Sequence, residues 1–338
     1  MYFFLNDYGE IAHPRILEAI ARENLIPEEG YYKDSHSESA RKLIQKEIGE
    51  EIEVDIHFIT GGTIANLTMI SACLRPHQAV IAPESAHIFT HETGAIEACG
   101  HKILAVASAD GKIRAKDILR VLEEHHGEHM VEPAMVYITN ATELGTVYTR
   151  EELSELHNVC RENNLYLYCD GARMGSGLMS KYSDVTMRDM AKYTDAFTIG
   201  GTKNGAMLGE AIVIVNASLS SGFRFITKQK GGLLAKGKVI GIQFEELFRD
   251  GLFYQLAEKE NSMAQKLAKA FYEKGYSFLC EPQSNQLFPI ISKEKLKKLQ
   301  EEIQLMVWKK MDDNQYAVRV TTSWNTTEEA VDALIQKI

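Results

Sequence analysis

The sequence lacks several features that would assign it to a membrane, a secreted or a nucleic-acid-binding class. None of its apolar runs approaches the ~20 residues of a membrane-spanning helix. Its five cysteines are scattered and include no C-x-x-C pair, so we expect reduced thiols in a reducing compartment. Acidic residues outnumber basic ones, 47 to 37, which argues against nucleic-acid or anionic-membrane partners. The first residues contain no basic segment and do not resemble a signal peptide. We expect a soluble, cytoplasmic protein.

Internal repeats and low-complexity segments are also absent, and the composition, 45% hydrophobic and 25% charged, is typical of a globular protein. From about residue 54, short apolar runs alternate with helical stretches. The expected strands are Val54–Ile59, Ala79–Ala82, Ile103–Val106, Ala134–Thr139, Leu165–Cys169, Ala196–Ile199 and Ala211–Val215, and the clearest helices are Ala65–Leu74, Ala115–Glu124 and Arg150–Asn163. This alternation predicts an α/β fold with a mostly parallel, seven-stranded sheet and helices on both faces.

The pattern changes after about residue 235, where long amphipathic helices and short strands follow. We therefore predict two domains. Residues 1–235 would form an N-terminal arm and a large domain, and residues 236–338 a smaller α+β domain. Near the end of the large domain, Lys228–Gly232 is expected to be a basic, flexible loop.

A glycine-rich turn follows the first strand and opens a helix, with Gly62, Thr63 and Asn66 as the candidate ligands. Free backbone N–H groups at a helix N-terminus favour an anion such as phosphate. The turn matches neither G-x-x-x-x-G-K-[ST] nor G-x-G-x-x-G, which weakens a nucleotide interpretation. Taken alone, it is equally consistent with an ordinary helix start.

Other chemically active residues also follow strands, where ligands bind in parallel sheets. His87 follows the second strand, Asp170 and Arg173 follow the fifth, and Lys203 lies on a glycine-rich turn after the sixth. Each has an ordinary alternative: an acidic turn, a solvated lysine, a structural histidine. His87 and His91 are spaced to share a metal, but no third ligand lies nearby, and we predict no metal site.

Together these residues form the set that pyridoxal phosphate requires: a phosphate anchor, a ring to stack on, a carboxylate for the pyridine nitrogen and a lysine amine. Lys203 is then interpreted as a Schiff-base lysine. The agreement of these signals in order and position outweighs their separate alternatives.

The chain resembles the threonine aldolases of the β-eliminating lyase group, within the fold-type I pyridoxal-phosphate enzymes. The resemblance is carried by Asn6-Asp7-Tyr8, Thr60–Asn66, Ala86-His87, Asp170-Gly171-Ala172-Arg173, Gly200–Gly205 and Arg319-x-x-Thr322-Ser323-Trp324, which extend over nearly the whole chain.

The resemblance implies a role for each candidate residue. Lys203 would bind the cofactor, Asp170 its ring nitrogen and His87 its ring face. Arg173, Arg319 and Asn6 would bind the substrate's α-carboxylate. The implied reaction is retro-aldol cleavage of L-threonine or L-allo-threonine to glycine and acetaldehyde, with His87 as a catalytic base or a stacking group.

Transamination and β-elimination on another small amino acid remain alternative reactions, because they use the same cofactor residues. A non-catalytic module of this fold would be expected to lose Lys203 or Asp170, and both are present. The resemblance also implies a homo-oligomer, a dimer or a tetramer, with Lys228–Gly232 as the segment that reaches the neighbouring subunit.

Overall fold

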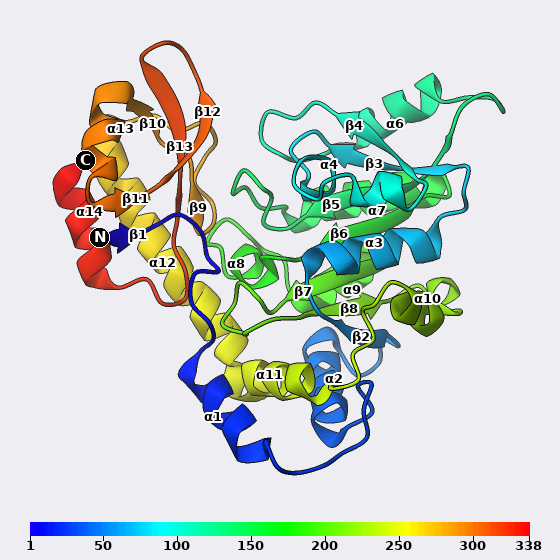
Figure 1. Cartoon of the computed structure of the whole chain (residues 1–338). Coiled ribbons are helices and arrows are strands. Elements are labelled where there is room, and N and C mark those ends of the chain that lie inside the picture. The colour runs from blue at the N-terminus through cyan, green and yellow to red at the C-terminus, as the bar shows by residue number, and fades with distance from the viewer.

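A seven-stranded sheet forms the centre of the larger part of the molecule in the computed structural model, which describes residues 1–338. The strand order is β2-β8-β7-β6-β5-β3-β4 (Figure 1). Only β8 is antiparallel to its neighbours, β2 and β7, so the prediction of a mostly parallel sheet of seven strands is confirmed. The strands are β2 (Asp55–Ile59), β3 (Gln78–Pro83), β4 (Lys102–Val106), β5 (Glu132–Thr139), β6 (Tyr166–Asp170), β7 (Ala196–Gly200) and β8 (Glu210–Ile214).

Helices cover both faces of this sheet, because successive strand residues point to opposite sides. Along β5, Val136 and Ile138 belong to one buried cluster, whereas Met135 and Tyr137 belong to the other. The first face carries α2 (Ser35–Ile48), α6 (Ala115–Glu124), α7 (Arg150–Glu162), α9 (Met187–Tyr193) and α11 (Lys238–Phe248). The second face carries α3 (Gly62–Cys73), α5 (Ala95–Ala98) and α10 (Phe223–Gln229). The short helices α4 (His87–Thr90) and α8 (Met174–Leu178) follow β3 and β6.

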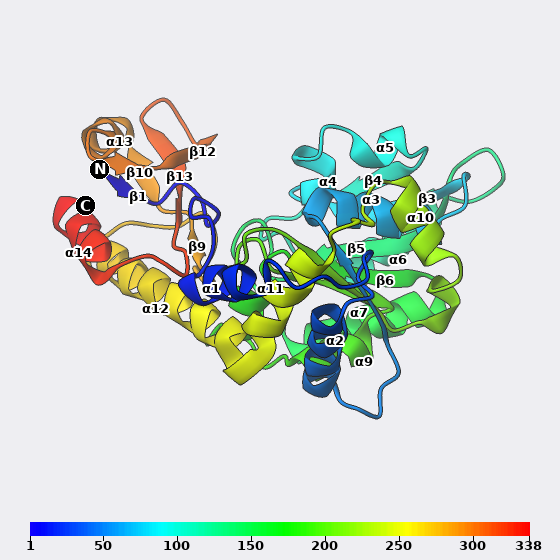
Figure 2. The same cartoon turned by 60° about the horizontal axis from the view of Figure 1, so that its bottom comes forward.

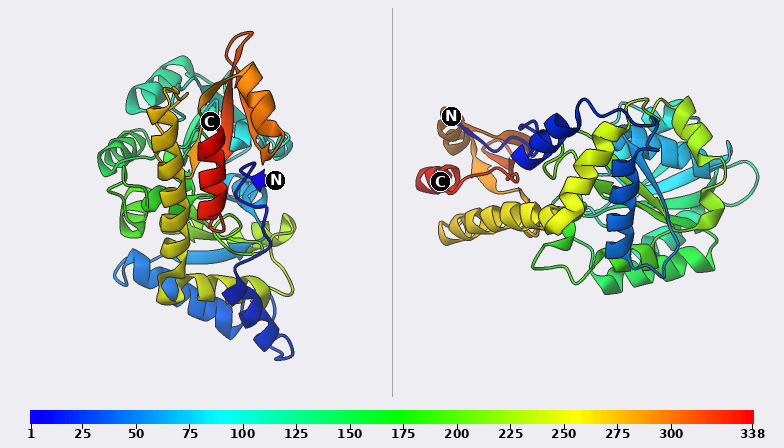
Figure 3. Two further views of the ribbon diagram at one scale, coloured as in Figure 1. Left: turned by 90° about the vertical axis from the view of Figure 1, so that its left-hand side faces the viewer. Right: turned by 90° about the horizontal axis from the view of Figure 1, so that it is seen from below.

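The smaller part of the molecule has its own sheet and its own apolar core. It contains β9 (Gln286–Leu287), β10 (Ile290–Ser292), β11 (Ile303–Gln304), β12 (Met306–Lys310), β13 (Gln315–Thr321), α13 (Lys293–Gln300) and α14 (Glu328–Lys337). Helix α12 (Leu252–Glu273) runs from the large part into it, beside α14 (Figure 3). The N-terminal strand β1 (Tyr2–Phe3) pairs with β11, so both chain ends lie in this part (Figures 1 and 2).

The apolar clusters show which elements belong together. Helix α11 packs on α2 and contributes Ile240, Phe244 and Leu247 to the core of the large part. The core of the small part begins at Met263 and also includes Phe4 of the N-terminal arm. The proposed boundary at residue 236 assigns α11 to the small domain, whereas this helix packs with the large sheet.

One element differs from its prediction. Residues 228–232, expected to be a flexible loop, form the end of helix α10 and the tight turn that follows it. The helix begins at Phe223, which is buried against the sheet, while Phe225 points outward. Separately, none of the helices combines the length and the apolar composition that a membrane span requires.

Candidate functional site

The site lies at the carboxyl edge of the sheet, where two glycine-containing turns contact each other. Gly200 donates its N–H to the carbonyl of Gly171 at 2.8 Å. A Cβ on Gly171 would lie 1.9 Å from the Thr198 carbonyl oxygen, and one on Gly200 would lie 2.4 Å from the Ala172 oxygen. Only glycine permits this approach. The contact places the turn after β6, with Asp170, beside the turn after β7, with Lys203.

Two adjoining chambers open at this edge, with volumes of about 40 and 100 Å³. We call them the Asp170 chamber and the Arg319 chamber. The Asp170 chamber is lined by Gly62, His87, Thr139, Ala141, Glu143, Asp170, Ala172, Arg173 and Lys203. The Arg319 chamber is lined by Tyr8, His87, His91, Glu143, Arg173, Lys203, Gln286, Met306, Trp308 and Arg319. The second chamber thus lies between the large sheet and strands β12 and β13.

The Asp170 carboxylate is buried and fixed by three donors. The Ala172 N–H donates to Oδ1, and the Tyr137 hydroxyl and Asn66 Nδ2 donate to Oδ2, each at 2.8 Å. Asn66 also donates to Glu92 Oε1 at 2.8 Å and accepts from the Tyr168 hydroxyl at 2.9 Å. The amide of Asn66, predicted to help bind the cofactor, is thus used to hold the Asp170 carboxylate.

His87 is oriented by the same network. Its Nδ1 lies 2.8 Å from Glu92 Oε1, so Nδ1 carries the proton and Nε2 is the remaining acceptor. One ring face lies against His91, with the centroids 5.5 Å apart. His91 in turn stacks on Trp308 of β12 at 6.0 Å. His87 and His91, whose spacing in the sequence would suit a metal, are therefore part of an aromatic stack that connects the two parts of the molecule.

Lys203 is the amine of the site, and it has no ion pair within 4.0 Å and no hydrogen bond. Burial, reinforced by the charge of Arg173, lowers the pKa of Lys203. Burial likewise raises the pKa of Glu210, which lies beside it at the start of β8. Both effects favour uncharged forms, and an uncharged amine is the nucleophile that Schiff-base chemistry needs.

Two arginines line the Arg319 chamber, and their guanidinium groups differ in how many of their donors are paired. Arg173 makes a bidentate ion pair with the buried Asp7, with Nε 2.6 Å from Oδ2 and Nη2 3.0 Å from Oδ1. Arg319 donates from Nη2 to the Leu5 carbonyl at 3.2 Å, whereas its buried Nε has no partner. An unpaired buried donor is costly, and a substrate carboxylate would satisfy it. Asn6, predicted to assist, instead accepts from the Tyr8 N–H and does not line either chamber.

The N-terminus of α3 lies at the Asp170 chamber. No side chain caps this helix, and Gly62 lines the chamber, while Thr63 is exposed. A Cβ on Gly61 or Gly62 would meet nothing within 4 Å. The first turn of α3 therefore offers unpaired N–H donors beside open space, which suits a phosphate.

Three further charged residues complete the site: Asp7, Glu92 and Glu143. Glu143 lies four residues after the end of β5, as His87 does after β3, so the rule used for the other strands would have found it. Asp7 and Glu92 follow no strand of the sheet, so the strand rule does not reach them; Asp7 lies in the Asn6-Asp7-Tyr8 motif of the resemblance, which assigned it no role.

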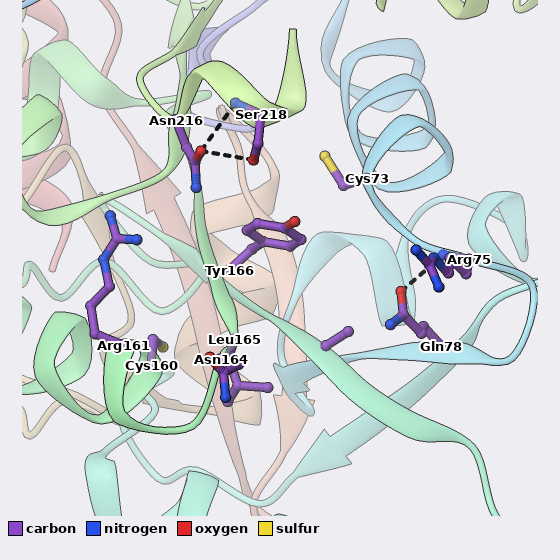
Figure 4. A pocket seen from close by; sticks show the side chains of 11 residues that line it. Cys73, Arg75, Gln78, Cys160, Arg161, Asn164, Leu165, Tyr166, Asn216 and Ser218 are labelled. Carbon is purple, nitrogen blue, oxygen red and sulfur yellow. Dashed lines mark hydrogen bonds between the residues drawn. The ribbon is translucent and has the colours of Figure 1, made fainter. Parts of the chain in front are cut away.

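A separate cavity of about 390 Å³ lies at the opposite edge of the sheet, near the start of β3 and β6 (Figure 4). Its polar lining includes Arg75 and Arg161, and burial raises the pKa values of its two cysteines, Cys73 and Cys160. It contains neither a lysine nor a carboxylate. It therefore lacks the groups found at the carboxyl edge.

The residues at the carboxyl edge fit pyridoxal phosphate. The unpaired amine of Lys203, the fixed carboxylate of Asp170 and the uncapped N-terminus of α3 belong to one chamber. These are the three groups that hold the cofactor's aldehyde, pyridine nitrogen and phosphate in enzymes of this type.

Comparison with known proteins identifies the family. The β-eliminating lyase family model matches residues 14–294. The low-specificity L-threonine aldolase of Pseudomonas aeruginosa is 28% identical over 99% of this chain and 96% of its own length. A structure of Leishmania major threonine aldolase superposes with a TM-score of 0.98 at 43% identity, covering 99% of this chain and 98% of that one. Alanine–glyoxylate aminotransferase from Nostoc sp., at 16% identity and a TM-score of 0.69, shares the fold alone. The chain belongs to the β-eliminating lyase family.

Proposed function

We propose that this protein is a pyridoxal-phosphate-dependent threonine aldolase that cleaves L-threonine and L-allo-threonine to glycine and acetaldehyde. The observation that carries the proposal is the junction of the two chambers, where Lys203 and Asp170 adjoin a second space closed by Arg319. The 43% identity with the Leishmania major threonine aldolase across 99% of the chain supports the choice of reaction.

Each group of the Asp170 chamber has a defined task toward the cofactor. Lys203 Nζ would hold it covalently, Asp170 would bind the pyridine nitrogen, and Gly62 and Thr63 of α3 would bind the phosphate. His87 would lie on the ring. When bound, pyridoxal phosphate supplies an electron sink for the bond that breaks at Cα.

The Arg319 chamber would orient the amino acid. Arg319, with its unpaired Nε, binds the α-carboxylate directly. Arg173 has two of its nitrogens engaged by Asp7 and offers Nη1. Fixing the carboxylate sets the direction of the Cα–Cβ bond. A group at the junction must then accept the β-hydroxyl proton, and His87 Nε2 is the predicted candidate.

We also propose that the protein is a homo-oligomer, a dimer or a tetramer. The surface beside α10 supports this, because Phe225 is 83% exposed and Tyr31 is 41% exposed. Arg224 donates to the Tyr31 carbonyl, and Lys228 lies over the Tyr31 ring, so the two aromatic side chains belong to neighbouring segments.

The test uses the purified protein reconstituted with pyridoxal phosphate. Wild-type protein should show the cofactor's long-wavelength absorbance and release acetaldehyde and glycine in equal amounts from L-threonine. Lys203→Ala should lose both, while Lys192→Ala, on the surface of α9, should retain both. Acetaldehyde is measured by coupled reduction and glycine by amino-acid analysis.

Other outcomes would contradict the proposal. Release of ammonia and a 2-oxo acid would indicate an eliminating enzyme. Conversion of a 2-oxo acid to an amino acid without aldehyde would indicate an aminotransferase. Absence of a cofactor band after reconstitution would contradict the assignment of Lys203.

A further inference from the structure

Four residues line both chambers: His87, Glu143, Arg173 and Lys203. The Asp170 chamber has the groups for a cofactor, and the Arg319 chamber has the groups for an amino-acid carboxylate. If each ligand occupies its own chamber, the reacting carbons lie at the boundary. The side chains shared by both chambers are then the ones within reach of the bond that breaks.

Arg173 is permanently protonated and paired with Asp7, so it cannot accept a proton. Lys203 is a free amine once the substrate displaces it, and we assign it to the proton at Cα, which leaves His87 and Glu143 for the hydroxyl proton. His87 has Nδ1 engaged by Glu92 and one ring face against His91, and 41% of its side chain is exposed. Glu143 is the remaining acceptor and the only carboxylate at the boundary.

The carboxylate of Glu143 is held in place by hydrogen bonds and can still accept a proton. Its Oε1 accepts from the His87 backbone N–H and its Oε2 accepts from the Thr139 hydroxyl, both at 2.8 Å. Each carboxylate oxygen has a second lone pair, so one proton can still be accepted. It lies four residues after the end of β5, and the two hydrogen bonds fix its position, as acid–base catalysis requires.

We propose that Glu143 is the general base that accepts the β-hydroxyl proton during Cα–Cβ cleavage, an inference that rests on the proposed function. The O–H bond breaks and the proton passes to the Glu143 carboxylate. The oxygen's electron pair forms the carbonyl bond of the aldehyde as the Cα–Cβ bond breaks. The electron pair of that bond remains with the glycine half, and the aldehyde leaves.

The electrostatic surroundings of Glu143 suit this task. Burial and the nearby Asp170 raise the pKa of Glu143, and hydrogen bonds from Thr139 and from the His87 N–H partly oppose that rise. The facing cations are Arg173 and Lys203, which line the same space. A carboxyl group whose pKa lies closer to neutrality is a more effective proton acceptor.

The principal test compares Glu143→Gln with wild-type holoenzyme in two reactions. Aldehyde release from L-threonine should fall by about 10²- to 10⁴-fold in kcat, with a much smaller change in KM. Exchange of the glycine α-proton into deuterated water, followed by nuclear magnetic resonance, involves no β-hydroxyl and should fall far less. Glu97→Gln, an exposed glutamate on α5, is the matched control.

A second measurement does not depend on turnover. Infrared spectra of the protein without cofactor should show a protonated-carboxyl band that appears as the pH is lowered and is missing in Glu143→Gln. Thr139→Val removes the hydrogen bond that lowers the Glu143 pKa, so this band and the acidic limb of the kcat profile should both move to higher pH.

The possible outcomes separate the two proposals. If the wild type releases no aldehyde from any β-hydroxy amino acid, the proposed function fails. If the wild type is active and Glu143→Gln retains its kcat while His87→Asn loses aldehyde release selectively, His87 is the base and our inference is wrong. Equal loss of both reactions in Glu143→Gln would also overturn it. If Glu143→Gln does not fold, Glu143→Asp, which keeps the carboxylate but shortens its reach, should show the same selective loss.

Discussion

At the scale of single residues, the ion pair between Asp7 and Arg173 is the most strongly buried charge contact of the site. The Asp7 side chain is fully buried, and Asn285 Nδ2 also donates to it at 2.9 Å. Burial alone would raise the pKa of Asp7, but the charges of Arg173 and Lys203 outweigh it and lower the pKa below the ordinary 3.8. Asp7 is therefore ionised throughout the physiological range and holds Arg173 in place.

We expect Asp7→Asn to reduce the free energy of unfolding by about 3 kcal/mol, because the Arg173 charge would be left buried without its partner. A depressed folded-state pKa gives stability that is present above the unfolded-state pKa and is lost as the pH falls through the folded-state value. The difference between variant and wild type should therefore stay constant from pH 8 to pH 5 and shrink only below about pH 4. Urea unfolding across this range measures it.

The exposed pair Glu294–Lys298 on α13 provides the control, since Glu294→Gln should leave the stability essentially unchanged. A difference for Asp7→Asn that fades between pH 7 and pH 5 would show that Asp7 titrates near neutrality and would contradict the assignment.

Arg319 carries a second prediction at this scale. Because its buried Nε is unpaired, Arg319→Ala should raise KM for L-threonine by about 10- to 100-fold through loss of a charged hydrogen bond. Arg120→Ala, at an exposed position of α6, should leave KM unchanged. If Arg319→Ala leaves KM unchanged and Arg173→Ala raises it, the arginine that binds the substrate carboxylate is Arg173 and not Arg319.

The residues that could be predicted from the sequence are those that follow a strand. Lys203, Asp170 and His87 lie at one sheet edge for that reason, and their meeting follows from parallel topology. The hydrogen-bond partners of these residues could not be predicted, because they are side chains of segments that lie far away in the sequence. Asn66 lies in the predicted turn, yet its amide reaches Asp170, 104 positions away.

At the scale of elements, the start of α3 gives a prediction that separates folding from binding. Gly62 is the first residue of the helix, and a Cβ there would meet nothing in the protein. Gly62→Ala should keep or slightly raise the stability of the cofactor-free protein, by up to about 1 kcal/mol, because alanine is the better helix former. It should nevertheless weaken pyridoxal-phosphate binding, since the methyl group occupies space beside the donors.

Thermal unfolding without cofactor and titration with pyridoxal phosphate measure the two effects separately. If cofactor affinity is unchanged while Thr63→Ala reduces it, the phosphate would be held through the side chain of Thr63. Loss of stability in the cofactor-free variant would show that the space beside Gly62 is filled by the protein itself.

The element boundaries follow from local patterns where those patterns are strong. Helix α7 begins at Arg150, as expected, after Thr149, whose hydroxyl accepts from the Glu152 N–H while the Glu152 carboxylate accepts from the Thr149 N–H. The end of helix α10 was predicted to be a flexible loop, because residues 228–232 are basic and end in two glycines. Burial of Phe223 and Thr227 against the sheet stabilises a helix that its local composition does not reveal.

At the scale of the whole molecule, the substrate space depends on both parts of the chain. Trp308 and Arg319 lie on strands of the small sheet, whereas His87 and Lys203 follow strands β3 and β7 of the large one. The stack of His87, His91 and Trp308, with the Arg319 guanidinium 5.7 Å from the Trp308 ring centre, crosses between them. The shape of the Arg319 chamber is therefore set by how the two parts are packed, which the sequence of either part alone does not determine.

The surface beside α10 carries the last prediction. Phe225 exposes 83% of its area, and burying such a side chain between two copies contributes about 1.5–3 kcal/mol per copy. Phe225→Glu should therefore shift the protein toward smaller species, measured by size-exclusion chromatography with light scattering. Leu119→Glu, at a 44% exposed position of α6, should leave the assembly unchanged. If Phe225→Glu keeps the wild-type mass and Leu119→Glu reduces it, the contact between copies lies on the α6 side. A wild-type protein that is monomeric at all concentrations would contradict the oligomer itself.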